Sequence, residues 1–315
     1  MTNKEVEVLG KCRVSVVGSI NMDLVTETKT FPKKGETVLG ENFFTSFGGK
    51  GANQAIASAR LGAEVKMFGC VGKDDYGDKL LQNLEKNHVN TDNVSMIEGA
   101  PSGVASITIS EKDNSIVIVP GANSYMTPDL LQNNKDALIQ SDVILASLEI
   151  PLETVMKASE IATEHNIPFI LNPAPAMRLP DYLLDRCTLL TPNEHELAAS
   201  LGKENEQADL EDLLNGYKGQ IVVTRGDSGA ILKSSQGDLE YIPSYKVDVV
   251  DTTGAGDAFN GAVAFMLAKG EEIRKAVSFA MAVGAISVTK HGAQNGLPFL
   301  EECKKFINKY ENESN

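Results

Sequence analysis

The sequence has no tryptophan, only four cysteines and no apolar run long enough to span a bilayer. The cysteines, Cys12, Cys70, Cys187 and Cys303, are widely spaced and form no Cys-x-x-Cys pair. This spacing argues against a structural disulfide and more strongly against a zinc site. The polar first ten residues lack the apolar region of a signal peptide. These absences predict a cytoplasmic protein whose thiols are reduced and isolated.

Basic residues are also scarce. The chain of 315 residues holds 29 lysines and arginines against 43 acidic residues, so its formal net charge is −14 at pH 7. We expect such a surface to repel nucleic acid and anionic membranes, and neither is an expected partner. A polyanionic ligand would need a local positive site or a metal ion. The length suits one large α/β domain or two smaller ones.

From residue 128 onward, strand and helix patterns alternate. This predicts an α/β fold with a three-layer core, a mostly parallel sheet covered by helices on both faces. The expected strands are 13–17, 65–71, 142–148, 168–171, 188–190 and 221–224, followed by a hairpin of 230–234 and 239–242. The expected helices are one ending at 61, then 78–87, 128–140, 152–165, 257–269, 271–288 and 299–310. A capping box of Thr191 and Glu194 should start another helix, and residues 311–315 should be disordered.

Two segments, 24–47 and 101–119, have β character without interleaved helices, which predicts a small sheet lying over a site. The expected division is a core of residues 10–22, 48–100 and 120–312 with a β lid of residues 23–47 and 101–119. The lid would have exposed edges and an apolar face that includes Phe43, Phe44, Ile107 and Ile109. Pairing two such sheets would bury both faces, which predicts a homodimer through the lid.

A glycine-rich turn, Asp251-Thr252-Thr253-Gly254-Ala255-Gly256-Asp257, carries the strongest local signal. A strand-like run, 245–250, precedes it, and the helix expected at 257–269 follows. Glycines permit positive φ, so successive N–H groups can point at one anion near a helix N-terminus. Asp257 should stay ionised beside that terminus, where it suits a base that takes a proton from an alcohol. Taken alone, the turn is equally compatible with an ordinary helix start.

A second glycine-rich segment is Gly48-Gly49-Lys50-Gly51-Ala52-Asn53-Gln54. It is not a Walker A loop, because Lys50 is followed by glycine, and it lacks the third glycine of a dinucleotide fingerprint. It offers a backbone that can approach a ligand closely, with a cation at Lys50 and an amide at Asn53. Asn21 and Asp23 alternate after the first strand and could hold two hydroxyls of a polyol. Either feature alone would fit a surface loop or a polar strand end.

The polar motif residues mostly follow strands, and ligands bind at this edge of open α/β sheets. The two glycine-rich motifs, with Asn193-x-x-Glu196, Asn172-Pro173-Ala174-Pro175 and Lys290-His291-Gly292-Ala293-Gln294, resemble the ribokinase-like (PfkB) family of sugar kinases. The match runs in order from about residue 12 to residue 300. The resemblance implies ATP-dependent phosphorylation of D-ribose at O5, giving D-ribose 5-phosphate and ADP. Kinases of deoxyribose, fructose or a nucleoside, a non-catalytic sugar-binding regulator and a dinucleotide oxidoreductase are the alternatives.

The resemblance also implies roles for individual residues. Asp257 matches the catalytic base, beside an anion hole of Gly254, Ala255 and Gly256. The matching sugar-binding residues are Asn21, Asp23, Gly49, Lys50, Gly51, Asn53 and Glu149. The matching ATP contacts are Asn193, Thr224, Arg225, Gly226, Asp227, Ser228, Gly229 and Gly256. Glu196 matches a Mg²⁺ residue, and a monovalent-cation (K⁺) site matches Asp251, Thr253, Ser287, Lys290, Gly292 and Gly296. The family often has serine where this chain has Gly296, so one cation ligand differs.

Overall fold

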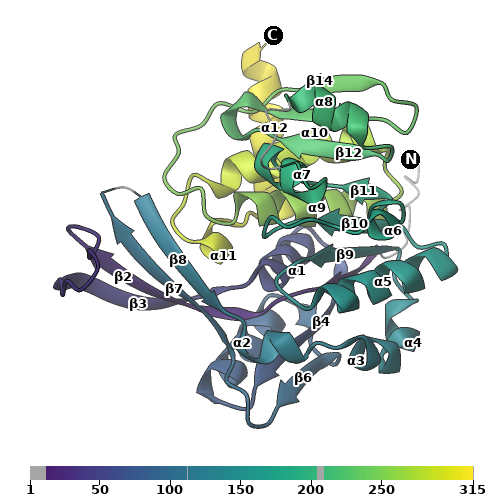
Figure 1. The fold of residues 1–315 in the computed structure, drawn as a ribbon. Helices are drawn as coiled ribbons and strands as arrows, with labels where there is room; N and C mark the ends of the chain where they lie inside the picture. The colour runs from purple at the N-terminus through teal and green to yellow at the C-terminus, as the bar shows by residue number, and fades with distance from the viewer. Residues whose placement is uncertain (1–11, 112, 204–208, 315) are drawn as a thin grey trace, which may run out of the picture.

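The computed structural model describes residues 12–111, 113–203 and 209–314, and it contains two sheets (Figure 1). The larger sheet has the strand order β14-β13-β12-β11-β10-β9-β1-β4-β5, with β6 paired to β4 off this path. Its strands are β1 (Arg13–Val17), β4 (Glu64–Gly72), β5 (Val89–Asn90), β6 (Val94–Ile97), β9 (Val143–Ser147), β10 (Phe169–Asn172), β11 (Leu189–Leu190), β12 (Ile221–Thr224), β13 (Ala230–Lys233) and β14 (Leu239–Ile242). All pair in parallel except β13 and β14, which form the expected antiparallel hairpin at one edge.

Helices cover both faces of this sheet, as the alternating pattern predicts. One face packs against α1 (Lys50–Arg60), α2 (Asp75–Lys86), α9 (Ala255–Ala268), α10 (Ile273–Ser287) and α12 (Leu300–Ser314). The other packs against α3 (Pro128–Asn133), α4 (Lys135–Leu138), α5 (Leu152–Glu164), α6 (Asp181–Leu184), α7 (Glu194–Ser200) and α8 (Leu210–Gly216). Within β9, Val143 and Leu145 enter the first core and Ile144 enters the second, because successive strand side chains point to opposite faces. This double burial explains the uninterrupted apolar strands of the sequence.

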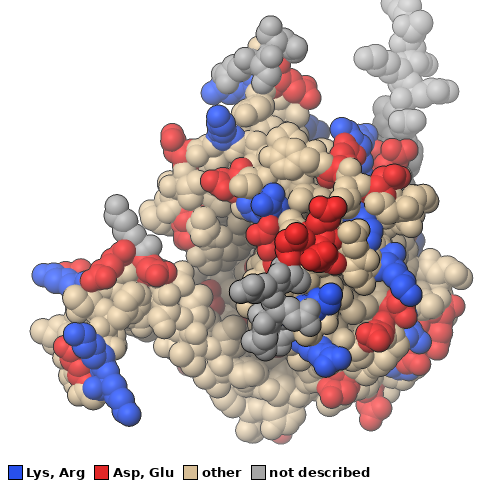
Figure 2. Space-filling view, turned by 45° about the horizontal axis from the view of Figure 1, so that its top comes forward, with Lys and Arg blue, Asp and Glu red and all other residues tan. Residues whose placement is uncertain are grey.

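The small sheet is separate and projects from the core (Figure 1). Its order is β3 (Gly40–Gly48), β2 (Asn21–Thr28), β7 (Gly103–Ser110) and β8 (Asp113–Val119). We call these four strands the lid. Phe43 is 62% exposed and Val117 is 61% exposed, so apolar side chains on the outer strands lie open to solvent. In Figure 2 the lid stands apart from the body, with charged side chains gathered toward its tip. The two β segments therefore form one sheet, as expected.

Several expected boundaries are wrong. Residues 245–250 form no strand, and Val250 N donates instead to Val288 O, at the end of α10, at 2.8 Å. The helix expected at 128–140 is broken at Asn134, whose side chain donates to Leu130 O. The tail expected to be disordered at 311–315 continues α12 to Ser314, and residue 315 lies outside the described residues. The same holds for residues 10 and 11 of the expected core.

Short elements between the long ones carry no strong periodicity and were not expected. They are the strands β5 and β6, the helices α6 and α8, α11 (Ala293–Gly296), and the 3-10 turns η1 (Gly121–Tyr125) and η2 (Gly226–Ser228). All four cysteines are free, in line with the isolated thiols expected, and all four are buried. Among the helices of the described residues, none is long and apolar enough to cross a membrane.

Candidate active site

A cavity of about 130 Å³ lies at the carboxyl ends of the parallel strands. Residues from both glycine-rich motifs and from three strand ends line it: Lys50, Asn172, Ala174, Thr191, Asn193, Glu196, Thr224, Gly254, Gly256, Asp257 and Asn260. Segments about 200 residues apart in the sequence therefore meet at one place. This is the edge at which the sequence predicted that polar residues gather.

Asp257 lies in the first turn of α9, and its residue is 7% exposed. Its Oδ2 accepts a hydrogen bond from Asn53 Nδ2 at 2.8 Å, and its Oδ1 accepts one from Gln54 Nε2 at 3.0 Å. Burial raises the pKa of Asp257, against the opposing effects of Lys50 and of the two amide donors. The sequence predicted that the helix terminus would keep this group ionised, so the direction differs. Because two amides already fix its plane, the carboxylate is held rigidly at the cavity wall.

Lys50 and Glu149 form the charged side of the site. The Lys50 Nζ lies 4.0 Å from Glu149 Oε1, and the backbone N–H of Lys50 donates to Glu149 Oε2 at 3.1 Å. Burial alone would lower the pKa of Lys50, but the negative charges of Asp257, Glu149, Glu196 and Asp23 outweigh it and raise the pKa. The ammonium therefore stays charged among several carboxyl groups.

Asp23 stands at the start of β2, where the lid leaves the core. Burial and, to a smaller extent, the nearby charges of Glu149 and Asp257 raise its pKa to about 7, against the lowering effect of Lys50. A Cβ at Gly48, the residue of β3 that pairs with Asn21, would lie 2.3 Å from the Asp23 carboxyl oxygens. Only glycine there leaves room for this carboxyl group.

Asn21 is 2% exposed, and the side-chain amide of Asn123 orients its side chain. Asn123 Nδ2 donates to Asn21 Oδ1 at 2.8 Å, while Asn123 Oδ1 accepts from Ile20 N at 2.9 Å. Asn21 Nδ2 then points toward Glu149 Oε2, at 3.5 Å. Of the predicted sugar-binding residues, Asn21 and Lys50 thus share Glu149 as a partner, and Asn53 is bonded to Asp257. Gly49 and Gly51 stand at the start of α1.

The glycine turn before α9 has the geometry expected of it in part. Gly254 is left-handed, with φ 80°, and a Cβ there would lie 2.9 Å from Ala293 Cα. The turn places Gly256 at the cavity and at the positive end of α9. The N–H of Ala255, however, donates to Thr252 O at 3.2 Å. One of the three expected anion-hole amides is therefore engaged within the turn.

The predicted nucleotide residues follow β11 and β12. Asn193 is the N-cap of α7 and forms a capping box with Glu196, so the box expected at Thr191 and Glu194 was misplaced by two residues. Asn193 pairs with Thr224 through a parallel bridge, and both line the cavity. Glu196 lines it as well, and burial raises its pKa. The residues Arg225, Gly226, Asp227, Ser228 and Gly229 form the turn after β12, outside the cavity wall.

The predicted cation loops lie behind the glycine turn. Asp251 bridges them, because its Oδ1 accepts from Thr253 N at 2.9 Å and its Oδ2 from Gly292 N at 2.8 Å. A Cβ at Gly296 would lie 2.4 Å from Ser287 O, so this backbone has no space for the serine common in the family. Lys290 Nζ pairs with Glu302, which leaves only its carbonyl for the predicted role. Within the described part of the chain, no three His, Cys, Asp or Glu side chains cluster as a metal site.

Several site residues were missed by the sequence analysis. Gln54 is fully buried and donates to both Asp257 and Asn172 Oδ1, the latter at 3.1 Å. Gln294 Nε2 donates to Asn53 Oδ1 at 3.0 Å. Both belong to quoted motifs, Gly-Ala-Asn-Gln and Gly-Ala-Gln, but a buried amide has no periodicity that would reveal its partner. Asn123, at a short 3-10 turn, gave no signal.

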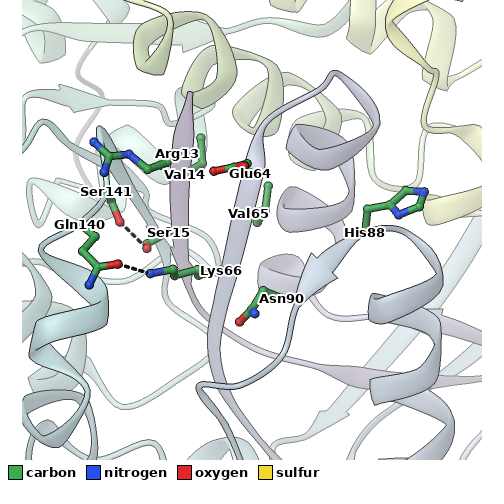
Figure 3. A pocket seen from close by; sticks show the side chains of 10 residues that line it. All are labelled: Arg13, Val14, Ser15, Glu64, Val65, Lys66, His88, Asn90, Gln140 and Ser141. Atoms are coloured by element: carbon green, nitrogen blue, oxygen red, sulfur yellow. Dashed lines mark hydrogen bonds between the residues drawn. The ribbon is translucent and has the colours of Figure 1, made fainter. Parts of the chain in front are cut away.

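A larger cavity of about 330 Å³ opens at the opposite, amino ends of β1, β4 and β9 (Figure 3). Its polar groups bond to one another: Lys66 Nζ to Gln140 Oε1 at 2.8 Å, and Ser15 Oγ to Ser141 Oγ at 2.5 Å. Arg13 at its rim pairs with Asp142 at 2.6 Å. The smaller cavity is lined by two carboxyl groups whose pKa burial raises, Asp257 and Glu196, so we place the chemistry there.

Comparisons with known proteins show the family of this chain. Residues 11–300 match the model of the "pfkB family carbohydrate kinase". A ribokinase from Bacillus subtilis is 44% identical over 295 residues, covering 93% of this chain and 99% of that protein. A deoxyribokinase from Salmonella typhimurium is 36% identical over 301 residues, covering 93% and 98%. The structure of Arabidopsis thaliana ribokinase complexed with ribose and ATP is similar with a TM-score of 0.86, at 29% identity over 94% of this chain and 99% of that one.

Proposed function

The chain belongs to the pfkB family of carbohydrate kinases, and on this premise we propose that it transfers the γ-phosphoryl group of ATP to O5 of D-ribose. The products are D-ribose 5-phosphate and ADP. The observation that carries the proposal is the buried Asp257 carboxyl group, held by two amide donors at a cavity that Lys50 and the Gly254–Gly256 turn share. That arrangement suits a base at an alcohol and donors at the incoming phosphoryl group.

The sugar is proposed to lie between Asp257 and the group of Asn21, Asp23, Lys50, Asn53 and Glu149, with Gly49 and Gly51 at its edge. These side chains supply both donors and acceptors, which a polyhydroxyl ligand needs in order to leave few polar atoms unpaired. Asp257 takes the O5 proton while O5 attacks the γ-phosphorus and the bond to the ADP oxygen breaks. General-base catalysis of this kind contributes typically ~10²–10⁴-fold.

ATP is proposed to extend from the Gly254–Gly256 turn toward Asn193, Thr224 and the turn from Arg225 to Gly229. The positive end of α9 and the amide of Gly256 would stabilise the transferred phosphoryl group, and each such donor can contribute ~10²–10³-fold. The N–H of Ala255 would join them only after its bond to Thr252 O opens. Lys50, the one basic residue among the described residues that line the cavity, neutralises part of the charge.

The site fits Mg²⁺ brought in with ATP better than a preformed metal cage. Mg²⁺ in nucleotide sites keeps several waters and uses one or two carboxylates besides the phosphates. Glu196 is the candidate carboxylate: it lines the cavity and has no basic side chain bonded to it among the described residues. When bound, the ion would offset negative charge on the β- and γ-phosphates.

For K⁺, the candidate ligands are Asp251 and the backbone around Thr253, Ser287, Lys290, Gly292 and Gly296. Asp251 already joins the two loops, so the loops are close enough to share an ion. A cation there would add positive charge behind the Gly254–Gly256 turn. The absence of a side chain at Gly296 leaves the backbone or a water to complete the shell.

The test is sugar-dependent ADP release in a coupled assay, run with ribose, deoxyribose, fructose and a nucleoside, with and without potassium. We expect the highest kcat/KM for ribose and activation by potassium. The similarity to a deoxyribokinase makes deoxyribose the strongest rival substrate, and a preference for it would replace ribose in the proposal. Sugar binding without ADP release from any of the four would instead indicate a non-catalytic regulator. Equal rates in potassium-free, sodium-free buffer would remove the cation site.

We further propose that two copies pair through the lid, in the cytoplasm. The exposed apolar side chains of β3 and β8, Phe43 and Phe44 among them, support a partner surface there. The strand edges of the lid support it too, because they present unpaired backbone groups. A lid covering the sugar would also exclude water and suppress hydrolysis of ATP.

A further inference from the structure

Three side-chain amides form a one-way relay that ends on Asp257. Asn83 Nδ2 of α2 donates to Gln294 Oε1 at 2.7 Å, Gln294 Nε2 donates to Asn53 Oδ1 at 3.0 Å, and Asn53 Nδ2 donates to Asp257 Oδ2 at 2.8 Å. Each amide accepts at its oxygen and donates at its nitrogen, so the direction is the same at every step. The relay joins α2, the loop containing α11, α1 and α9.

The two ends fix the direction. An ionised carboxylate only accepts hydrogen bonds, so Asn53 must turn its nitrogen to Asp257 and its oxygen away. The outward oxygen is satisfied only if its neighbour donates. Gln294 meets that need, and both amides are 5% exposed, so water does not readily replace either partner. Without the donor from Gln294, an inverted Asn53 amide would place its oxygen against a carboxylate oxygen.

The loop that carries Gln294 has its own anchor. Arg60 Nη1 donates to the backbone oxygens of Gln294 and Leu297, each at 2.7 Å, and its guanidinium carbon lies 5.2 Å from the centre of the Phe299 ring. The backbone of α11 is therefore fixed without the Gln294 side chain. Removing that side chain should leave the loop in place and remove the hydrogen bond that Gln294 donates to Asn53.

We propose that Gln294 is a positioning residue: it locks the orientation of the Asn53 amide, and thereby the aim of the base Asp257 at the sugar hydroxyl. This inference rests on the proposed function for the role of Asp257. Gln294 itself touches neither reacting atom. Its effect on turnover runs entirely through Asn53, which makes the two residues energetically coupled.

Two substitutions separate positioning from packing. Gln294→Glu keeps an oxygen to accept from Asn83 but has no N–H for Asn53, while Gln294→Met keeps the bulk and loses both bonds. We expect each to lower kcat about 10- to 100-fold, because a small misplacement of a reacting group has that effect. The KM for ATP should change little, whereas the Tm should fall somewhat, because each substitution leaves a buried amide group unpaired. The matched control is Gln82→Glu, the same charge change at an exposed position on α2, with kcat unchanged.

A double-mutant cycle with Asn53→Ala decides the route. In the Asn53→Ala background, adding Gln294→Met should change kcat by less than ~2-fold, because the amide that Gln294 orients is gone. An undiminished loss of kcat in that background would overturn the proposal, as would a near-normal kcat in Gln294→Glu. Every variant is measured with the sugar that wild-type protein turns over best. Failure of wild type to phosphorylate ribose would sink the proposed function alone and leave this comparison intact.

Discussion

The two ends of the main sheet carry cavities of opposite character. The cavity at the amino ends is the larger, about 330 Å³ against about 130 Å³, but several of its polar groups are paired: Lys66 with Gln140, Ser15 with Ser141, and Arg13 with Asp142. At the carboxyl ends, burial raises the pKa of Asp23, Asp257 and Glu196, and the polar atom Gln54 Oε1 is buried without a partner. The difference indicates that raised pKa values of buried carboxyl groups are a better guide to the site than cavity volume. Strongly shifted pKa values cluster at functional sites, so this contrast supports the placement of the proposed site at the carboxyl ends.

The opposite shifts have a common physical origin. Burial would raise the pKa of Asp142 at the amino end as well, but hydrogen bonds and the charge of Arg13 outweigh it and lower the pKa. Asp23 at the carboxyl end has Lys50 nearby, yet burial and two like charges prevail. At the amino end the protein thus stabilises the charged form of Asp142. At the carboxyl end it destabilises the charged form of Asp23.

The largest effect should come from Asp257→Asn at the carboxyl end. Asparagine keeps the shape of the side chain but cannot take the O5 proton, so we expect kcat to fall ~10²–10⁴-fold. ATP and sugar should still bind, as calorimetry can check. Lys66→Met at the amino end is the control and should leave kcat unchanged. A near-normal kcat in Asp257→Asn would show that the base lies elsewhere and would remove the contrast between the two ends.

A smaller effect is a pH-dependent gain in stability from Asp23→Asn. The folded pKa of about 7 lies above the ordinary value, so the folded state holds a proton that the unfolded chain releases. The stability from this proton is fully present below about pH 4 and is lost as the pH rises through about 7. We expect the variant to exceed wild type in free energy of unfolding by about 1–2 kcal/mol near pH 8 and by little near pH 4. Denaturant titrations at both pH values measure this, and a constant difference would contradict it.

The smallest effect belongs to Asp142→Asn, and its sign is reversed. A lowered folded pKa contributes stability above the ordinary pKa that is lost as the pH falls. The Arg13 pair is half-exposed, so we expect the substitution to cost only about 0.5–1 kcal/mol near pH 7 and less near pH 3. Turnover should not change. A stabilising effect of the substitution at neutral pH would contradict the stabilising role given to the Arg13–Asp142 pair.

Much of the fold was accessible from the sequence, because it depends on local patterns. Buried parallel strands give uninterrupted apolar runs, and α2, α3, α7 and α8 each begin at a side chain that caps the helix. The failures come from tertiary competition: the valines near position 250 have β propensity, but the backbone N–H of Val250 donates to Val288 O at the end of α10 instead of to a strand. The capping box moved from Thr191 to Asn193 because Thr191 Oγ1 bonds to Leu171 O and Asn260 in the core.

The candidate site was predicted unevenly for a similar reason. Glycine-rich turns and the polar residues within them can be recognised by residue type and spacing, so the sequence identified Asp257, Lys50 and Asn53 as candidates. Their supports were not, because a buried glutamine or asparagine acquires its meaning only from what folding places beside it. Gln54 and Asn123 come from a helix interior and a short turn. The pKa of Asp257 was misjudged because the sequence shows its helix terminus and hides its burial.

The root of the lid coincides with the proposed sugar site. β2 runs unbroken from Asn21 beside Asn123 to Thr28 at the far end, with β3 and β7 hydrogen-bonded along its two sides. A sheet braced in this way moves as one body, so a small rotation at its root displaces its tip. A bound hydroxyl group that displaces Asn21 or Asp23 would therefore displace the tip of the lid. Under the proposed pairing, the second copy would move with it.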